Sequence, residues 1–590
     1  MSTNFSKPKI KRKLRAKRKQ FVALGESANK HIDRHIFRRW NNLQYAKRFI
    51  AGWVALMILL IFGVVFQTTA LGKHYLEPSP IAGGIYTEGI EGNFSNANPI
   101  YASSGVDAAV SKIIFSSLLT YDDTGKLKGD LAESWNASSN GRVYSVKLKP
   151  NIKWHDGKNL TADDVVYTYA TIQNADAKSP LYSGWKGVKV EKINDQNVKF
   201  TLPTPYAPFP NLLTNGILPK HILGQDDPAS LRSASFNTQG TVGSGPFKLV
   251  SSDSNSNSDK QVIQLTSNKD YYLGPPGLDG ITIKTYKDAK SLSNALDKKE
   301  VVGAGGLNVK DYQIKSPNSY SFTQNSATML FMKNSAPALA DAKVRQALTH
   351  STQVMDITKQ LGYDATPVRE PLLVGQTGYN KDFWQYGYNK QEADKLFNEA
   401  GWLRVDGKKY RQKNGQDLSL KLVSENNSIY PSLATELQKQ WAEAGVKLDV
   451  SFVTPDQITQ TYIPNHEYDI FLYGINIGPD PDVYAYWHSS QADTGTARLN
   501  LSEYKSTTAN IALESARSRS DPALRAAKYK PFLEAWKKDA PAIGLYQPRY
   551  LYLTNQPVYN LHTERNVNSP EDRFNNVHEW MINTAKVQKQ

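Results

Sequence analysis

Apolar and polar residues alternate, or recur at helical spacing, along most of the chain beyond residue 81. Between residues 144 and 149 three apolar residues alternate with three polar ones, which is the period of a half-buried strand. After a turn at Asp156-Gly157, Thr161 stands at a helix N-cap and Asp164 takes the capping-box position. The helix that follows has one apolar face, formed by Val165, Tyr169 and Ile172.

The rhythm of helix and strand is clearest in the C-terminal half. A helix is predicted from Asn389 to Gly401, with an apolar face of Ala393, Leu396, Phe397 and Ala400. A strand, a helix and a second strand follow, marked by apolar residues within 418–422, 433–444 and 446–452. Two strands that flank a helix form a βαβ unit, which indicates an α/β protein. No repeat of fixed period is present, which argues against a solenoid.

The uncharged run from Phe49 to Gly72 departs from this pattern and is long enough to span a bilayer. Twelve of its first 18 residues are Leu, Ile, Val or Phe, which favours insertion by about 4 to 7 kcal/mol. Lys47 and Arg48 precede it, so residues 1–48 are expected in the cytoplasm, residues 73–80 form a linker, and the rest lies outside. This predicts a single-pass protein of the cell membrane with an extracellular or periplasmic domain. The alternative is a signal peptide cleaved near Thr68-Thr69-Ala70, which the long N-terminal segment disfavours.

The positive charge of the chain is concentrated before this run. Of the formal net charge of +16, residues 1–48 hold +13, with fifteen Lys or Arg against Glu26 and Asp33. The remainder therefore has no electrostatic reason to bind nucleic acid. The basic segment is expected to fix the topology and to contact anionic lipid. The absence of cysteine excludes a disulfide framework and a lipid-modified cysteine.

Motifs of catalysis or metal binding are not supported. His155 is a lone histidine on a turn, which is more typical of a structural hydrogen bond than of a catalytic group. His466-Glu467 begins like a zinc-protease helix, but Ile470 stands where the second histidine is needed. The sequence has neither a G-x-S-x-G elbow nor a phosphate-binding loop. We therefore expect a protein that is not an enzyme and that needs no cofactor or metal.

Seven segments, taken in order, resemble the family 5 extracellular solute-binding proteins of ABC importers, a group that includes oligopeptide- and dipeptide-binding proteins. The resemblance covers most of residues 81–590. It rests on "NPIY" (98–101), "GDLAESW" (129–135), "WHDGKNLTADDVVYTY" (154–169), "VGSGPFKLV" (242–250), "DAKVRQAL" (341–348), "YNKQEADKLFNEAGW" (388–402) and "DPDVYAYWHSSQ" (480–491).

The resemblance implies an α/β, two-lobed, periplasmic-binding-protein-like (type II) fold at 81–590, preceded by one transmembrane helix. The chain is expected to cross between the lobes near Ser321–Asn325 and near Pro541–Tyr546. Lobe I would then comprise about 81–322 and 541–590, and lobe II about 326–540. Hinge closure would enclose a solute and present the closed shape to a permease. The basic segment and transmembrane helix depart from the cleaved signal or lipidated cysteine that is usual in the family.

A cleft that strips water from its ligand needs aromatic walls and a few fixed polar groups. The loop after the expected strand Tyr468–Tyr473 supplies the main candidates, which are Tyr473, Asn476, Asp480, Tyr484, Trp487 and His488. Alternatively, Tyr484 and Trp487 belong to the core and Asp480 caps a helix. Trp185 and Glu88 are added from a second loop and from the first strand of lobe I.

In the family's peptide binders, an Asp in this loop pairs with the α-amine of the ligand. The matching residue here is Asn476, with a one-residue ambiguity toward Ile477. An amide supplies no negative charge, so the resemblance implies a ligand that either lacks a free amine there or finds its counter-charge in Asp480 or Glu88.

The sequence thus predicts the substrate-binding component of an ABC importer for peptides, in particular oligopeptides. The permease and ATPase subunits are expected on separate chains. The alternatives are a surface receptor or sensor with the same fold, an enzyme acting on the same ligand, and a binder of a non-peptide solute such as an oligosaccharide or a nickel complex.

Overall fold

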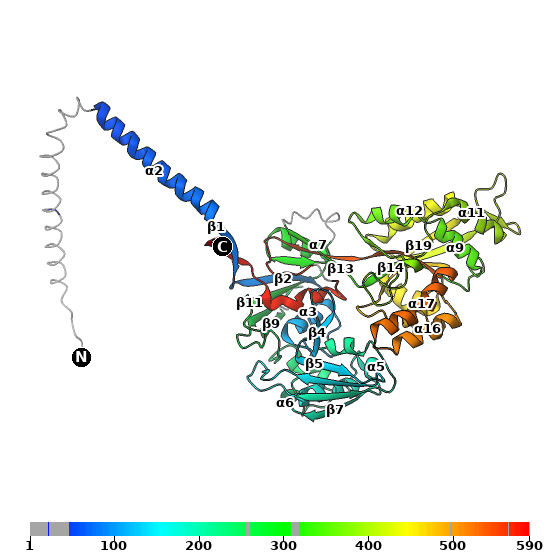
Figure 1. Cartoon of the computed structure of the whole chain (residues 1–590), viewed down its shortest axis with the longest axis horizontal. Coiled ribbons are helices and arrows are strands. Elements are labelled where there is room, and N and C mark those ends of the chain that lie inside the picture. The colour runs from blue at the N-terminus through cyan, green and yellow to red at the C-terminus, as the bar shows by residue number, and fades with distance from the viewer. Residues whose placement is uncertain are drawn as a thin grey trace. The chain divides into compact units, whose positions relative to one another are not determined.

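The computed structural model describes residue 22 and residues 47–588, with gaps at 255–259, 308–317, 496–497 and 564–565. The chain divides into two compact units, a smaller one that holds the N-terminal helix and the end of the chain, and a larger one from Pro80 to Asn583 (Figure 1). Most of the basic segment expected at 1–48 lies outside the described residues.

The smaller unit contains a long apolar helix, α2 (Lys47–Tyr75). Its stretch Phe49–Thr68 has a mean hydropathy of 2.8 and no buried surface, so by length and composition it is able to cross a membrane. The strand β1 (Leu76–Ile81) follows directly and pairs with β23 (Asn583–Gln588). Residues 73–80, expected to be a linker, are therefore the end of α2 and most of β1.

In the larger unit, lobe I is built on a seven-stranded mixed sheet of order β13-β22-β12-β2-β11-β10-β9. The central strand β2 (Ile85–Glu91) is parallel to β11 (Gly280–Tyr286) and to β12 (Gly303–Gly305). The other strands run antiparallel to their neighbours and are β9 (Phe247–Ser254), β10 (Gln261–Ser267), β13 (Asn318–Thr323) and β22 (Arg549–Thr554). The principal helices of this lobe are α3 (Gly105–Ile114), α4 (Ala162–Gln173) and α7 (Ala289–Asp297).

Smaller sheets complete lobe I. A four-stranded antiparallel sheet has the order β5-β6-β8-β7, with β5 (Ala132–Ala137), β6 (Val143–Leu148), β7 (Lys189–Asn194) and β8 (Asn197–Thr201). A hairpin pairs β3 (Leu119–Tyr121) with β4 (Leu127–Gly129).

The segment from 154 to 169 builds lobe I. The predicted capping box is confirmed, because Thr161 accepts from the backbone of the first turn of α4 and Asp164 Oδ2 accepts from Thr161 N (2.9 Å). His155 Nδ1 accepts from Gly243 N (3.1 Å), so its other nitrogen donates to Gly245 O (3.0 Å). Burial lowers the pKa of His155 to about 4, because the charged ring would lose its solvation. This histidine therefore stays neutral and ties the turn to the irregular segment that directly precedes β9.

Lobe II is a six-stranded sheet of order β15-β21-β14-β20-β18-β19 with helices packed around it (Figure 1). The expected βαβ unit is confirmed, since β18 (Ser419–Glu425) and β19 (Lys447–Val453) are parallel and joined through α12 (Tyr430–Glu443). The remaining strands are β14 (Ser326–Met332), β15 (Thr366–Pro367), β20 (Ile470–Asn476) and β21 (Ala542–Gln547). The main helices besides α12 are α9 (Ala342–His350), α11 (Lys390–Glu399), α16 (Thr507–Arg517) and α17 (Pro522–Asp539).

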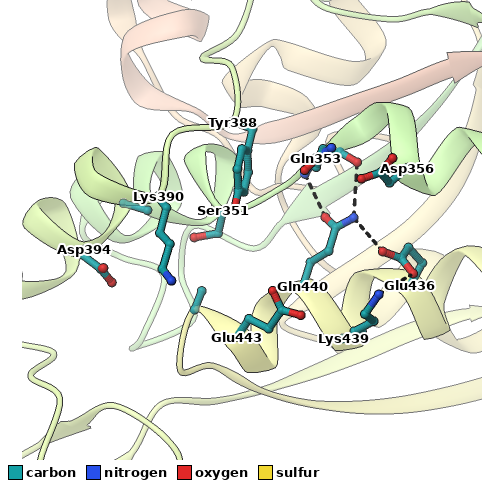
Figure 2. A pocket seen from close by; sticks show the side chains of 12 residues that line it. Ser351, Gln353, Asp356, Tyr388, Lys390, Asp394, Glu436, Lys439, Gln440 and Glu443 are labelled. Carbon is teal, nitrogen blue, oxygen red and sulfur yellow. Dashed lines mark hydrogen bonds and ion pairs between the residues drawn. The ribbon is translucent and has the colours of Figure 1, made fainter.

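A small pocket of about 130 Å³ lies within lobe II, between α11, α12 and the segment that follows α9 (Figure 2). Its polar groups bind one another: Gln353 N donates to Gln440 Oε1 (2.8 Å), and Gln440 Nε2 donates to Glu436 Oε1 (3.1 Å). These bonds join α12 to the turn after α9. The pocket is therefore a packing feature of one lobe.

The chain crosses between the lobes at residues 324–325, between β13 and β14, and at Pro548, between β21 and β22. The second crossing was expected at Pro541–Tyr546, but these residues precede or form β21 of lobe II, whose backbone pairs with β14. The part of lobe I that returns after the second crossing therefore begins at Arg549. Gln324 N donates to Pro548 O (2.9 Å), so the two crossings lie side by side.

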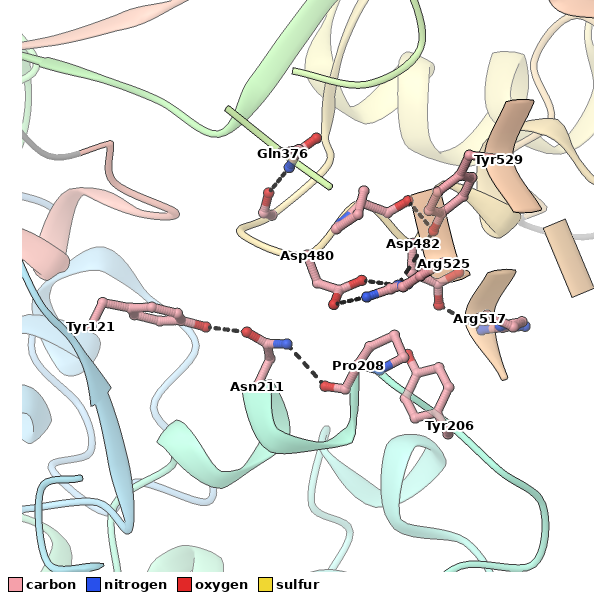
Figure 3. A network of polar contacts seen from close by, with 12 residues as sticks. Tyr121, Tyr206, Pro208, Asn211, Gln376, Asp480, Asp482, Arg517, Arg525 and Tyr529 are labelled. Atoms are coloured by element: carbon pink, nitrogen blue, oxygen red, sulfur yellow. Dashed lines mark hydrogen bonds and ion pairs between the residues drawn. The ribbon is translucent and has the colours of Figure 1, made fainter. Parts of the chain in front are cut away.

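The lobes also meet at Arg517, the last residue of α16 (Figure 3). Ala207 N of lobe I donates to Arg517 O (2.8 Å). The guanidinium lies 5.2 Å from the ring centroid of Tyr206 in lobe I and 4.1 Å from that of Tyr484 in lobe II. Asp482 holds it in place through an ion pair (2.8 Å). This cation between two aromatic rings is a direct attraction between the lobes.

A buried ion pair ties the tail of the chain into lobe I. Glu88 on β2 is fully buried, and its Oε1 accepts from Arg573 (2.6 Å). Its Oε2 accepts from the hydroxyls of Tyr86 (3.0 Å) and Tyr552 (2.5 Å). Because both carboxylate oxygens are bonded, the pair holds β2, β22 and the tail together.

We predict that Glu88→Gln lowers the free energy of unfolding by about 3 to 5 kcal/mol, because it leaves Arg573 buried without its carboxylate. Urea denaturation of the full-length chain measures the change. The control is Glu133→Gln, which removes the half-exposed partner of Lys147 and should cost less than about 1 kcal/mol. Equal effects of the two variants would contradict this view of the buried pair.

We also predict that Tyr206→Ala separates the lobes more often, because it removes a cation–π contact of about 0.5 to 2 kcal/mol. Since the chain has no cysteine, a fluorophore pair at Lys186→Cys and Lys528→Cys can report lobe separation by single-molecule energy transfer. Tyr206→Phe keeps the ring but loses the hydroxyl, which also interacts with Asp482 and Arg517, so its distribution should lie between those of Tyr206→Ala and the parent protein. Identical distributions for Tyr206→Ala and the parent would show that this contact does not hold the lobes.

Candidate ligand-binding cleft

A cavity of about 370 Å³ that is open to solvent lies between the two lobes, and its volume is within the range of about 300 to 1,000 Å³ typical of small-molecule sites. Lobe I lines it with α3, with the 3-10 helix η2 (Phe209–Thr214) and with residues 568–572. Lobe II contributes Asn476, Gly478 and Pro479. Most of the wall therefore comes from lobe I, and lobe II completes one side of it.

Amide and charged side chains share the wall of this cavity. The amides are Asn211, Asn215, Asn476 and Asn568, the carboxylates are Glu571 and Asp572, and the cation is Lys112. Asp572 Oδ2 accepts from the backbone N–H of Asn568 (2.9 Å) and so shapes the loop. Within the described part of the chain Glu571 forms no ion pair, so its charge is available to a ligand.

Asn476 is the one candidate from sequence that lines this cavity. It was expected in a loop after a strand ending at Tyr473, but β20 continues to Asn476 because its backbone pairs with Ser326. Its Oδ1 accepts from Gly478 N (3.0 Å), which leaves the amide N–H group to face a ligand. Such a group donates, and therefore cannot hold an ammonium ion.

Asp480 is engaged within lobe II (Figure 3). Its two oxygens accept from the guanidinium of Arg525 at 2.7 and 2.5 Å. Burial works against the charge of Arg525, but the hydrogen bonds and charge of Asp480 prevail and raise the pKa of the guanidinium. Asp480 therefore does not cap a helix, and its charge is already paired. The charge of Glu88 is likewise paired, with Arg573.

The two candidate tryptophans lie in the cores. Trp185 is 2% exposed and stacks on Tyr169 of α4, with ring centroids 3.9 Å apart. Trp487 is fully buried and packs edge-on against Trp536 of α17 (5.7 Å). Neither indole can touch a ligand in this conformation, so the expectation of ligand contact does not fit their burial. For Trp487, the alternative of a core residue describes its place.

The remaining candidates stabilise the fold of lobe II. His488 is 7% exposed, and its ring nitrogens contact Ser490 (2.8 Å) and Glu514 (3.2 Å). Tyr484 stacks on His488 with centroids 4.1 Å apart and also on Arg517. Tyr473 is half-buried and stacks on Phe471. Tyr484 and His488 are brought together beside Arg517, Tyr473 packs separately, and none of the three lines the cavity.

Sequence reasoning missed Lys112 and Glu571. Lys112 lies in the last turn of α3, where a basic residue is common because it complements the helix dipole. Glu571 follows Pro570 in the first turn of a 3-10 helix, where an acid is equally unremarkable. No local pattern distinguishes either from an ordinary surface charge. The nearest signal is "NPIY", because its Pro99 lines the cavity.

Comparison with known proteins gives the family. A family model described as "Bacterial extracellular solute-binding proteins, family 5 Middle" matches residues 126–496. The oligopeptide-binding protein AppA of Bacillus subtilis is 30% identical over 514 residues, which cover 82% of this chain and 91% of that protein. Its structure in complex with a nonapeptide has a TM-score of 0.65 at 28% identity, covering 86% of this chain and 100% of that one.

Two further structures are similar to this chain. The ABC transporter substrate binding protein CtaP of Listeria monocytogenes has a TM-score of 0.74 at 27% identity, covering 85% of this chain and 99% of that one. NikZ of Campylobacter jejuni, in complex with Ni(L-His), has a TM-score of 0.68 at 28% identity, covering 84% of this chain and 99% of that one. The two-lobed α/β fold inferred from the sequence is thereby confirmed, and the chain belongs to the family 5 bacterial extracellular solute-binding proteins.

Proposed function

We propose that this chain is the substrate-binding component of an ABC importer and captures short peptides outside the membrane. The observation that carries the proposal is the polar cavity between the lobes. Asparagine amides in its wall keep groups for the peptide units that every peptide presents: Nδ2 of Asn476 and Nδ2 of Asn568 can donate, and Oδ1 of Asn215 can accept, whereas Asn211 is bonded to Tyr121 and Pro208. The likeness to an oligopeptide-binding protein at 30% identity supports the same ligand class.

The cavity is open to solvent between the lobes, so its volume of about 370 Å³ sets no upper limit on the length of a bound peptide. Tripeptides are the simplest ligands that present an α-amine, peptide groups and a carboxylate together, and they are therefore the first to test.

Glu571 is the group we assign to the α-amine of such a peptide. It lines the cavity and pairs with no described cation, whereas Asp480 and Glu88 are each bound to an arginine. The donor group of Asn476 suits a ligand carbonyl oxygen instead. In this chain, recognition of the amine would thus come from lobe I, while lobe II supplies neutral groups.

We further propose that α2 remains as an uncleaved membrane anchor. The apolar stretch Phe49–Thr68 and the basic residues before it support this topology. The basic segment would then lie on the cytoplasmic face and contact anionic lipid. The permease and the ATPase would be separate chains, and the bound peptide would be released to them unchanged, without catalysis by this protein.

We predict that Ala-Ala-Ala binds the full-length protein in calorimetry, and that N-acetylation weakens its binding at least about tenfold, or 1.4 kcal/mol. The preference should disappear in Glu571→Gln, because an amide carries no charge to pair with the amine. Glu534→Gln makes the same chemical change at an exposed site on α17 and should leave it intact. A preference that survives Glu571→Gln would refute our assignment of the amine, and lack of binding by short peptides would refute the proposed ligand class.

We predict that protease added to intact cells degrades the domain beyond residue 80 and spares residues 1–48. The uncleaved anchor would keep the basic segment behind the membrane. Mass analysis of the mature N-terminus is the decisive control, because a start near Leu71 would show that the apolar helix is a removed signal peptide.

A further inference from the structure

A second, smaller pocket of about 130 Å³ lies in lobe I beside the cleft. Its wall includes Lys112, Phe115 and Ser117, and these three residues also line the interlobe cavity. The two spaces are therefore neighbours that share the C-terminal end of α3 as a common wall.

Three lysines give the pocket a positive charge. Lys112 comes from α3, Lys128 from β4 and Lys149 from the residue after β6, while Asp130 is the one carboxylate in the wall. Asp130 is already bonded, since it accepts from Tyr272 and from Ser117 N (2.9 Å). Within the described part of the chain none of the three lysines forms an ion pair.

Lys149 and Lys128 lie close enough for their charges to repel. Burial lowers the pKa of Lys149, the charge of Asp130 raises it, and the charge of Lys128 lowers it. Lys149 Nζ lies 5.4 Å from the ring centroid of Tyr272, which fixes it at the edge of the pocket. Like charges kept this close would be stabilised by an anion between them.

Asn575 provides an independent sign of a missing partner. It lines the same pocket, and both its Nδ2 and its Oδ1 are buried without a hydrogen-bond partner among the described residues. Buried polar atoms are almost always paired in folded proteins, so an orphaned amide in a pocket wall has room for a bound group or an ordered water as its partner. Nδ2 is a neutral donor and would add a further hydrogen bond to an anion held by the three lysine ammonium groups.

We propose that this lobe I pocket binds a small anionic group with oxygen acceptors, held by Lys112, Lys128, Lys149 and the amide of Asn575. The source of the anion that we favour is the side-chain carboxylate of a Glu or Asp in the captured peptide. This part of the inference rests on the proposed peptide function. A free anion such as phosphate offers the same chemistry. The pocket would then make the protein selective for acidic peptides.

The test uses calorimetry on the full-length chain with three matched pairs of tripeptides. Each pair places Glu or Gln at the first, middle or last position, with alanine elsewhere. At one position Glu should bind about tenfold more tightly than Gln, because it adds a charge-assisted contact. Lys149→Met should reduce the preference to less than about threefold, and the exposed Lys128→Met should do the same without endangering the fold. Lys126→Met is the matched control, because Lys126 is exposed on the same hairpin, lies outside the pocket, and should change nothing.

A second arm measures thermal stability in phosphate against chloride at equal ionic strength. Phosphate could stabilise the parent protein but not Lys149→Met, while Glu peptides bind no better than Gln peptides. That result would support an anion site in the pocket and assign it to a free anion rather than to a peptide side chain. Absence of both effects would overturn the proposal. Binding of Ala-Ala-Ala separates the two claims, since it reports on the proposed function whether or not the pocket takes an anion.

Discussion

The cleft depends on the hydrogen bonds of one buried residue, Asn325, at the first crossing between the lobes. Its N–H donates to Val567 O (2.8 Å), and its side chain donates to Asn568 Oδ1 (2.8 Å), both in lobe I. Its carbonyl accepts from the N–H groups of Ile477 (3.0 Å) and Gly478 (2.9 Å) in lobe II. Gly478 and Asn568 both line the cavity, so the hydrogen bonds of Asn325 connect the lobe I wall of the cavity to its lobe II wall. Buried backbone groups are costly to leave unpaired, so we expect these hydrogen bonds to persist when the lobes separate.

Local features of the fold could be predicted from sequence because their causes are local. The capping box of α4 needs only Thr161 and Asp164, three residues apart, and the apolar face of α12 repeats within one helix. The βαβ unit of lobe II follows from the spacing of such elements. The order of the seven motifs along the chain indicated the fold more strongly than any single motif, because each motif is weak alone and only their order is specific.

The candidate site was harder because its chemistry depends on partners remote in sequence. Asp480 became a structural residue through Arg525, which lies 45 positions away, and Glu88 through Arg573, which lies 485 positions away. No periodic pattern in the sequence indicates that two such distant residues form an ion pair. Trp487 shows the complementary difficulty: an indole in a polar, proline-containing loop resembles a ligand-stacking residue until its packing against Trp536 is known. Conversely, Glu571 could not be chosen in advance, because its importance comes from the absence of a described cation beside it.

The two lobes contribute unequally to the cavity. The charged groups in the wall, Lys112, Glu571 and Asp572, all come from lobe I. For the charged solute that we propose, the charged contacts would lie on lobe I, while in this conformation lobe II lines the cavity with Asn476, Gly478 and Pro479. A ligand shifts a conformational equilibrium only by its difference in affinity for the two states. The protein also holds its lobes together through its own groups, of which Arg517 between Tyr206 and Tyr484 is the clearest. Closure that is driven partly by the protein requires less of the ligand, and so it tolerates solutes of varied sequence.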